Sequence, residues 1–72
     1  MIAKYYKGNE YKYTYHYIVK VKPNKKYGYF ETTQKIYHHE IISIQRFNDI
    51  DRVEVYNEGE KKPIEVIDMK GD

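Results

Sequence analysis

The chain has 72 residues, no cysteine and a net charge of +2. A chain this short forms one domain, 1–72, that buries only about 60% of its unfolded surface, which argues against a deep active site. Without cysteine, neither disulfides nor a thiolate metal site can stabilise it. No apolar run approaches a membrane span and no secretory signal is visible. We therefore predict a cytoplasmic location and no membrane contact.

The apolar residues favour strands. Nine Ile, five Val, ten Tyr and two Phe stand against one Ala and no Leu. β-Branched and aromatic residues prefer strands, whereas Leu and Ala are among the best helix formers. This composition predicts an all-β domain.

The charge differs between the two halves. Residues 1–36 hold eight Lys, two Glu and eight of the ten Tyr, while residues 37–72 hold five basic and nine acidic residues. A basic, Tyr-rich half favours an anionic partner. The alternative is that strands of both halves interleave in the fold and mix their charges.

The first predicted elements are a strand at 2–6, a turn at 7–10 and a long strand at 11–22, YKYTYHYIVKVK. The last of these alternates with the period of a half-buried strand. Twelve residues at about 3.3 Å each span about 40 Å, more than the width of a small barrel. This strand must therefore bend or project, and its Val-rich end is the better candidate for the core.

Alternate tyrosines of this strand share one side of it: Tyr11, Tyr13, Tyr15 and Tyr17. Three interpretations are open, namely a wall of the core with hydroxyls at its rim, a stacking surface, and an interface with another protein or a second copy. We favour the wall and keep the four residues as a candidate protein interface.

The chain continues with a break at Pro23, which lacks a backbone donor, and a strand at 27–33 in which Gly28 marks a bulge or a close approach. Residues 35–47 are ambiguous. They start as extended chain, but apolar residues recur every third position from Ile41 to Ile50, which a short helix or 3₁₀ turn would place on one face. Strand and helical turn both stay open for residues 40–50.

The final elements are a turn at 48–51, a strand at 52–56, a mobile loop at 57–63 and a strand at 64–69, with 70–72 expected to be frayed. Five or six short strands in one sheet would leave both edges open. Closure of the sheet into a barrel would pair the two edge strands with each other and leave no open edge. The prediction is a small five- to six-stranded antiparallel barrel, OB-like or SH3-like, with at most one short helical turn.

Residues 25–30, KKYGYF, resemble the first nucleic-acid-binding motif of the cold-shock domains, an OB-fold family with the pattern K-G-[FY]-G-F-I. The run KIYHHEI at 35–41 is similar to that family's second motif, V-F-V-H-F. Further likeness in VKVK and in the last hairpin extends the resemblance over residues 18–70. Residues 1–17 have no counterpart there and form an additional N-terminal strand region.

The resemblance implies a platform on which bases stack, formed by Tyr27, Tyr29, Tyr37 and His39. Neighbouring lysines would contact the backbone: Lys20, Lys22, Lys25 and Lys26. Independently of the family, aromatic rings stack on any base, and lysine suits phosphates better than guanine edges. We therefore predict binding of single-stranded DNA or RNA with little sequence selectivity.

A second interpretation is a protein-binding module of the phage or mobile-element type that inhibits or modulates a host protein, such as a DNA-processing or defence nuclease. Tyrosine is enriched at protein interfaces too, and a homodimer is left open. His38 and His39 are adjacent and would point to opposite faces of a strand, and the chain has a single serine. No metal, cofactor or catalytic residue is predicted, and the protein is not expected to be an enzyme.

Overall fold

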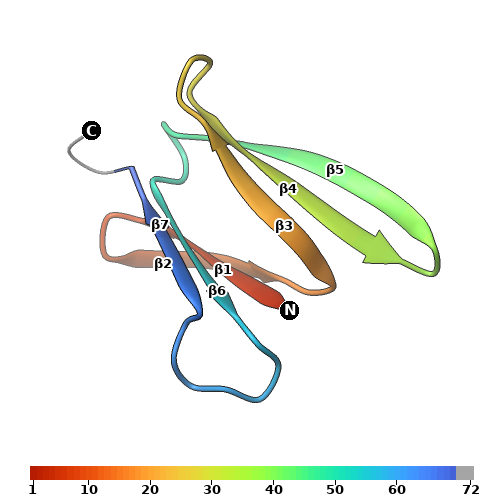
Figure 1. Ribbon diagram of the computed structural model, residues 1–72. Coiled ribbons are helices and arrows are strands. Elements are labelled where there is room, and N and C mark those ends of the chain that lie inside the picture. The colour runs from red at the N-terminus through yellow and green to blue at the C-terminus, as the bar shows by residue number, and fades with distance from the viewer. Residues whose placement is uncertain (70–72) are drawn as a thin grey trace.

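The computed structural model describes residues 1–69, which form seven β-strands and no helix (Figure 1). The strands are β1 (Ile2–Lys7), β2 (Glu10–Tyr15), β3 (Ile18–Asn24), β4 (Tyr29–Ile36), β5 (His39–Arg46), β6 (Arg52–Tyr56) and β7 (Glu65–Asp68). The all-β prediction is confirmed. The predicted frayed end, 70–72, lies outside the described residues.

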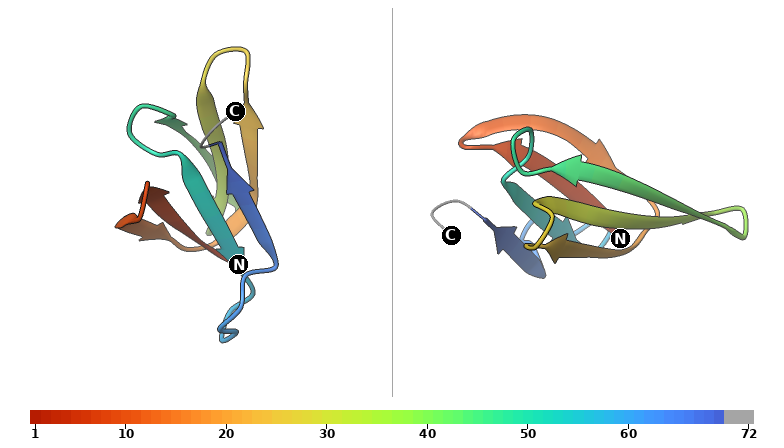
Figure 2. Two further views of the ribbon diagram at one scale, coloured as in Figure 1. Left: turned by 90° about the vertical axis from the view of Figure 1, so that its left-hand side faces the viewer. Right: turned by 90° about the horizontal axis from the view of Figure 1, so that it is seen from above.

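The strands are arranged in two antiparallel sheets that face each other as two layers (Figure 2). The first sheet has the order β2-β1-β6-β7 and the second the order β3-β4-β5. The predicted closed barrel of five or six strands is wrong. The edge strands β3 and β7 line a groove between the sheets and do not pair, and Pro23 of β3 has no N–H with which to close it.

The predicted single strand at 11–22 is divided between the two sheets. β2 ends at Tyr15 in the first sheet and β3 begins at Ile18 in the second. Tyr17 has a φ of 60°, a left-handed conformation that redirects the chain between the layers. The bend that the length of the stretch required is therefore present, at His16 and Tyr17.

The choice between strand and helical turn, which the sequence left open for residues 40–50, is decided by β5, a strand that ends at Arg46. Tyr37 and His38 form a two-residue turn with φ values of 50° and 68°, typical of a type I′ hairpin. β5 then pairs with β4 in an uninterrupted register. The recurrence of isoleucine every third residue arises because Ile41 and Ile44 lie on opposite faces of an exposed strand, not on one face of a helix.

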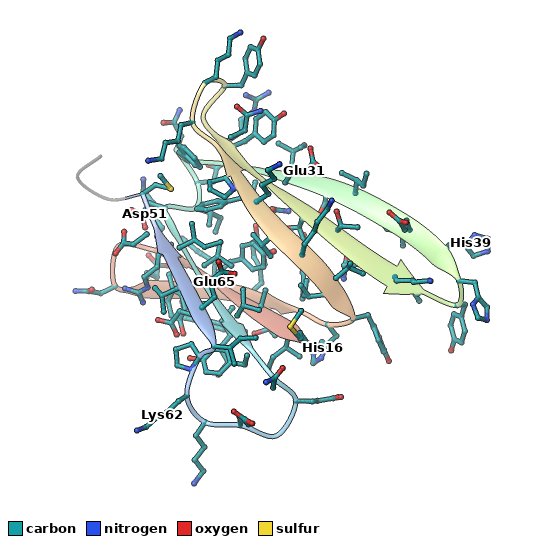
Figure 3. All side chains as sticks on the ribbon, in the orientation of Figure 1. His16, Glu31, His39, Asp51, Lys62 and Glu65 are labelled. Atoms are coloured by element: carbon teal, nitrogen blue, oxygen red, sulfur yellow. The ribbon has the colours of Figure 1, made fainter. Side chains whose placement is uncertain are left out.

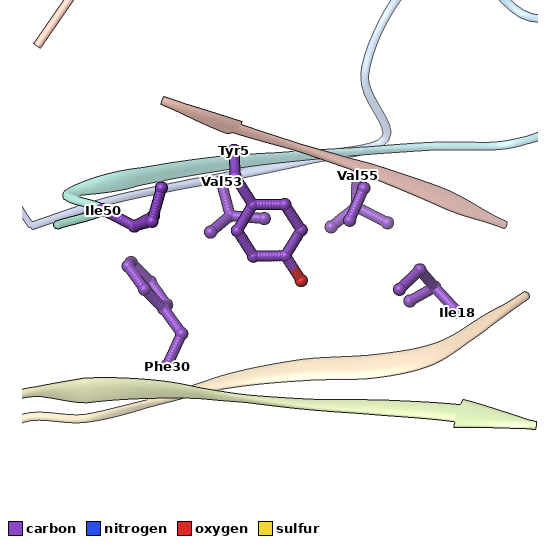
Figure 4. Packing of buried hydrophobic residues seen from close by; sticks show 7 residues of the cluster. Tyr5, Ile18, Phe30, Ile50, Val53 and Val55 are labelled. Atoms are coloured by element: carbon purple, nitrogen blue, oxygen red, sulfur yellow. The ribbon is translucent and has the colours of Figure 1, made fainter. Parts of the chain in front are cut away.

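Apolar side chains of both sheets fill the space between the layers (Figure 4). The buried set is Ala3, Tyr5, Val53 and Val55 from the first sheet, Ile18 and Phe30 from the second, and Ile50 from the connection between them. Phe30 contacts the half-buried Phe47 edge to face, with ring centroids 5.0 Å apart. This core is small, so each large member contributes a substantial part of the buried area.

Tyr5 is the centre of an aromatic cluster on the inner side of the first sheet. The rings of Tyr13 and Tyr15, on the neighbouring strand β2, each lie 5.1 Å from the ring of Tyr5. They also lie 5.1 Å from each other. Two tyrosines of the predicted ladder therefore form part of the wall of the core.

Candidate functional site

The candidate site is the outer face of the second sheet, the side that points away from the first sheet. Phe30 and Thr32 of β4 are buried in the core, so the alternate residues Tyr29, Glu31 and Lys35 point outward. The register then assigns neighbours to the same face. We call this surface the outer face, and it carries Lys20, Lys22, Tyr29, Glu31, Thr33, Lys35, Glu40, Ile42, Ile44 and Arg46.

Positive charge predominates on the outer face. It holds Lys20, Lys22, Lys35 and Arg46 against Glu31 and Glu40. Within residues 1–69, none of the three lysines takes part in an ion pair. Their ammonium groups are available to an anionic partner.

One end of the outer face is the turn between β3 and β4, which Asn24 organises. Asn24 Oδ1 accepts from the backbone N–H of Tyr27 at 3.1 Å, and its Nδ2 donates to the Tyr29 hydroxyl at 3.2 Å. Gly28, with a φ of 74°, completes the turn. Tyr27 is 64% exposed, and Lys26 Nζ lies 5.3 Å from its ring centroid. The turn thus presents one free aromatic face beside cationic side chains.

The opposite end of the outer face contains a shallow hollow lined by Tyr17, Lys35, Ile36 and Tyr37. Tyr17 is 65% exposed and Tyr37 is 90% exposed. The N–H of Lys35 donates to the carbonyl of Tyr17 at 3.0 Å, which ties the two segments together. Both tyrosines have positive φ, a conformation that bulky residues rarely adopt and that is common at functional sites.

The four residues of the predicted stacking platform do not form one cluster. Tyr27 and Tyr29 lie at the start of β4 and Tyr37 follows its end, about 25 Å away at the usual rise per residue. Tyr29 is half-buried and its hydroxyl bonds Asn24. His39 pairs with the inward-facing Ile36, so it lies on the other side of the sheet from the lysines, at the far end of the hairpin (Figure 3).

The lysines that were predicted from sequence are brought together more closely than the aromatics. Lys20 and Lys22 are neighbours on the outer face, and Lys25 and Lys26 lie in the adjoining turn. Lys35 was missed, although it stands two residues before Tyr37 in the same run. Tyr17 was assigned to the ladder, and its positive φ has no signal in the sequence.

The predicted interface of four tyrosines is also divided. A register shift beside Tyr5 and Tyr6 rotates Tyr11 to the outer side of the first sheet, where its ring contacts that of Tyr6 at 5.8 Å. Tyr13 and Tyr15 are half-buried on the inner side. Only Tyr11 and Tyr17 are exposed, and they lie in different places.

The outer side of the first sheet differs from the outer face because its charges are mutually paired. Arg52 lies over the ring of Tyr6 at 4.2 Å and 3.3 Å from Glu54. The Tyr56 hydroxyl donates to Glu54 at 2.6 Å, and this hydrogen bond, with burial, raises the pKa of Tyr56 to about 12. These side chains are therefore largely engaged with one another, although within residues 1–69 the buried Arg52 Nε lacks a hydrogen bond.

Within residues 1–69, no three His, Asp or Glu side chains lie close enough together to hold a metal ion. The same part of the chain contains no helix that could cross a membrane.

A scan against protein-family models and searches of curated proteins and of solved structures each found no match. The resemblance to the cold-shock domains therefore stays a prediction. Each of the two motifs that carry it spans one of the two turns that flank β4 and continues into at least one adjoining strand.

Proposed function

We propose that the outer face binds single-stranded DNA or RNA with little sequence selectivity. The observation that carries this proposal is the position of Lys20 and Lys22, which are side by side, outward-facing and without an ion pair in residues 1–69, between two ends that each expose tyrosine rings. Phosphates would contact the lysines, and bases would stack at the ends.

The arrangement suits a flexible strand better than a duplex. The exposed rings of Tyr27 and Tyr37 are separated by the length of β4, so a single strand would follow the sheet and stack at both ends. Lysines act as point charges and do not read base edges as arginine does. We propose a non-catalytic role in the cytoplasm, in which salt weakens binding strongly.

Fluorescence polarisation of labelled oligo-dT and oligo-U at low and moderate salt tests this function. We expect binding at low salt, weakened by about tenfold in Tyr27→Ala and in Tyr37→Ala because each removes a stacking ring. Tyr11→Ala, an exposed tyrosine on the other sheet, is the matched control and should leave affinity unchanged. Absence of binding at low salt would refute the proposal.

A second candidate function is binding to a host protein, as for a phage or mobile-element inhibitor of a nuclease. It is favoured by Ile42 and Ile44, which are 60% and 48% exposed on the same face, because protein interfaces bury such patches. A stoichiometric partner that Ile42→Ser abolishes, with no oligonucleotide binding by the wild type, would support this function over the first.

A further inference from the structure

The edge of β5 is open and unprotected. β5 is the outermost strand of the second sheet and pairs only with β4, over eight residues without a register shift. Open edges recruit other strands unless proline, lysine, a bulge or shortness prevents it. β5 has none of these features.

The other three edge strands are each protected. β3 contains Pro23 and two lysines, and its register shifts near Val19. β7 has four residues, and the pairing of β2 is interrupted by a register shift. Because every other edge is protected, β5 is the edge to which a further strand is expected to add.

Three isoleucines occupy the middle of β5, where an edge strand usually carries charged side chains. Ile41 is 45% exposed, and Ile42 and Ile44 are more exposed. β5 runs along the outer side of the molecule, and the hairpin that it forms with β4 extends beyond the first sheet (Figure 1). Ile42 and Ile44 also lie on the outer face, which points away from the first sheet.

The hairpin turn determines which backbone groups of β5 face outward. In a two-residue turn, the flanking residues Ile36 and His39 form a hydrogen-bonded pair. Hydrogen bonding then alternates along the strand, so odd-numbered residues of β5 bond β4. Even-numbered residues, from Glu40 to Arg46, direct their backbone groups to the open edge.

We propose that the chain forms a symmetric dimer in which β5 pairs antiparallel with β5 of a second copy, about a two-fold axis at Ser43. In this register Ile42 faces Ile44 of the second copy, and Glu40 faces Arg46 of the second copy. Symmetry repeats both pairs. Four isoleucines meet at the centre of the interface and an oppositely charged pair closes each end.

Only this register matches both the isoleucines and the charges. The outward backbone groups of the two copies oppose one another only when the two-fold axis passes through a residue of β5. Side chains on the outer face of one copy then lie beside those on the outer face of the other. An axis at Ile42 would place Glu40 against Ile44, and an axis at Ile44 would place Arg46 against Ile42. Like-with-like apolar pairs and opposite charges are the favourable cross-strand combinations.

Existing bonds leave the proposed partners available. Within residues 1–69, neither Glu40 nor Arg46 forms an ion pair. The Arg46 carbonyl already accepts from Asp49 and Ile50 at 2.9 Å, so Arg46 contributes its N–H alone. The two Ile42–Ile44 pairs can form both of their hydrogen bonds, whereas Glu40 can accept from the Arg46 N–H but finds no acceptor there for its own N–H.

The dimer would join the two second sheets into one continuous six-stranded sheet. Because the axis is perpendicular to the sheet, the outer faces of both copies, with Lys20, Lys22 and Lys35, would lie on the same side. The inference does not depend on nucleic-acid binding, since it rests on the edge and on the residues of β5 alone.

Sedimentation velocity over a range of concentrations tests the register by charge exchange. We expect the wild type to reach twice the 8.8 kDa mass of one chain. Glu40→Arg alone and Arg46→Glu alone should each weaken dimerisation by about tenfold or more, because like charges then meet twice. The double variant Glu40→Arg/Arg46→Glu should restore it. Glu58→Arg, in the loop after β6, is the control.

A second test uses the absence of native cysteine. Ser43 faces its own copy across the axis as a non-hydrogen-bonded pair, for which Cα atoms are about 4.5 Å apart, within disulfide range. Ser43→Cys should form a covalent dimer under mild oxidation. Ile41→Cys, whose equivalent lies about 13 Å away, should not.

Three outcomes would overturn the dimer. They are a wild type that stays monomeric at about 100 μM, a double charge exchange that fails to restore association, and equal crosslinking at positions 41 and 43. If the protein stays monomeric and binds a different protein through β5, the dimer is refuted and that protein is the partner of the edge. Sedimentation and crosslinking need no oligonucleotide, so their result is separate from that of the polarisation test.

Discussion

The hydroxyl of Tyr5, in the first sheet, donates a hydrogen bond to Thr32 Oγ1, in the second sheet, at the centre of the core. Thr32 in turn donates to Gln45 Oε1 at 2.6 Å, and Gln45 Nε2 donates to Ser43 at 2.9 Å. Tyr5, Thr32 and Gln45 are all buried. A polar chain therefore crosses the apolar core and fixes the position of one layer on the other.

The hydrogen-bonded chain from Tyr5 through Thr32 to Gln45 predicts which substitutions in it destabilise the protein most. Thr32→Val leaves the buried Tyr5 hydroxyl and the Gln45 oxygen without their hydrogen-bond partner. We expect it to lower the free energy of unfolding by about 2–4 kcal/mol. Tyr5→Phe removes only the terminal donor and should cost about 1 kcal/mol. The double variant should cost less than the sum. Urea unfolding measures all three, and additive losses would contradict the linkage.

The division of the tyrosine ladder predicts unequal effects at alternate positions. Tyr13→Ala removes a ring from the cluster around Tyr5 and should cost about 2–4 kcal/mol. Tyr11→Ala and Tyr17→Ala, at exposed positions, should each cost less than about 1 kcal/mol. Thermal unfolding of the three variants compares them directly, and equal losses would show that the ladder acts as one wall.

The turn at Tyr37 and His38 predicts a conflict between stability and binding. Tyr37→Asn/His38→Gly supplies the residues that a type I′ turn prefers and should stabilise the protein by about 1–2 kcal/mol. The same double variant should weaken oligonucleotide binding because it lacks the ring. His38→Gly alone is the control, which should gain stability and keep its affinity. A double variant with unchanged affinity would exclude Tyr37 from the site.

The lysine pair of β3 predicts a change in salt dependence. Replacing Lys20 and Lys22 together by Ala should reduce the slope of log affinity against log salt concentration by about 1.4, since each phosphate contact contributes about 0.7 for a single strand. The matched control replaces Lys61 and Lys62, in the loop before β7, and should leave the slope unchanged. Equal effects of the two pairs would indicate a diffuse charge effect without a site.

Buried tyrosines predict a loss of stability at alkaline pH. The hydrogen bond to Glu54 and burial raise the pKa of Tyr56 to about 12, and burial also raises the pKa of Tyr5. Since these values exceed the unfolded value of about 10, the stabilisation is complete below pH 10 and falls as the pH rises towards 12. Tyr56 should account for a measurable part of this loss.

Urea unfolding of the wild type and of Tyr56→Phe between pH 8 and pH 11.5 measures this loss. The variant should show a smaller decrease between pH 10 and the upper limit. Equal pH profiles would show that Tyr56 ionises in the folded state as readily as in the unfolded chain.

Alternation predicted the strands that have one buried face. Val53 and Val55 of β6 alternate with polar residues, and the strand at 52–56 was predicted with its observed bounds. β5 was not predicted because isoleucine occupies both of its faces, with Ile41 exposed on one and Ile42 and Ile44 exposed on the other. The closed barrel was wrong because strand counts do not show which edges pair, and β3 and β7 stay apart.

The candidate site was predictable in its charges but not in its shape. Lys20 and Lys22 alternate in sequence and are neighbours on the outer face, as a strand requires. The positive φ of Tyr17 and Tyr37 depends on where the chain turns between strands, and no single residue type specifies it. The distance between Tyr27 and Tyr37 could not be predicted from the sequence, because it depends on the whole of β4 lying between them as one extended strand.

The pairing of β1 with β6 has a consequence for the order of folding. Residues 2–6 find their partners at 52–56, so β1 cannot complete its sheet during synthesis until some fifty further residues have emerged. The two hairpins of the β3-β4-β5 sheet join neighbouring segments and can form much earlier. Until β6 arrives, the hairpin of β1 and β2 keeps one edge of β1 unpaired, and such an open edge favours aggregation of the nascent chain.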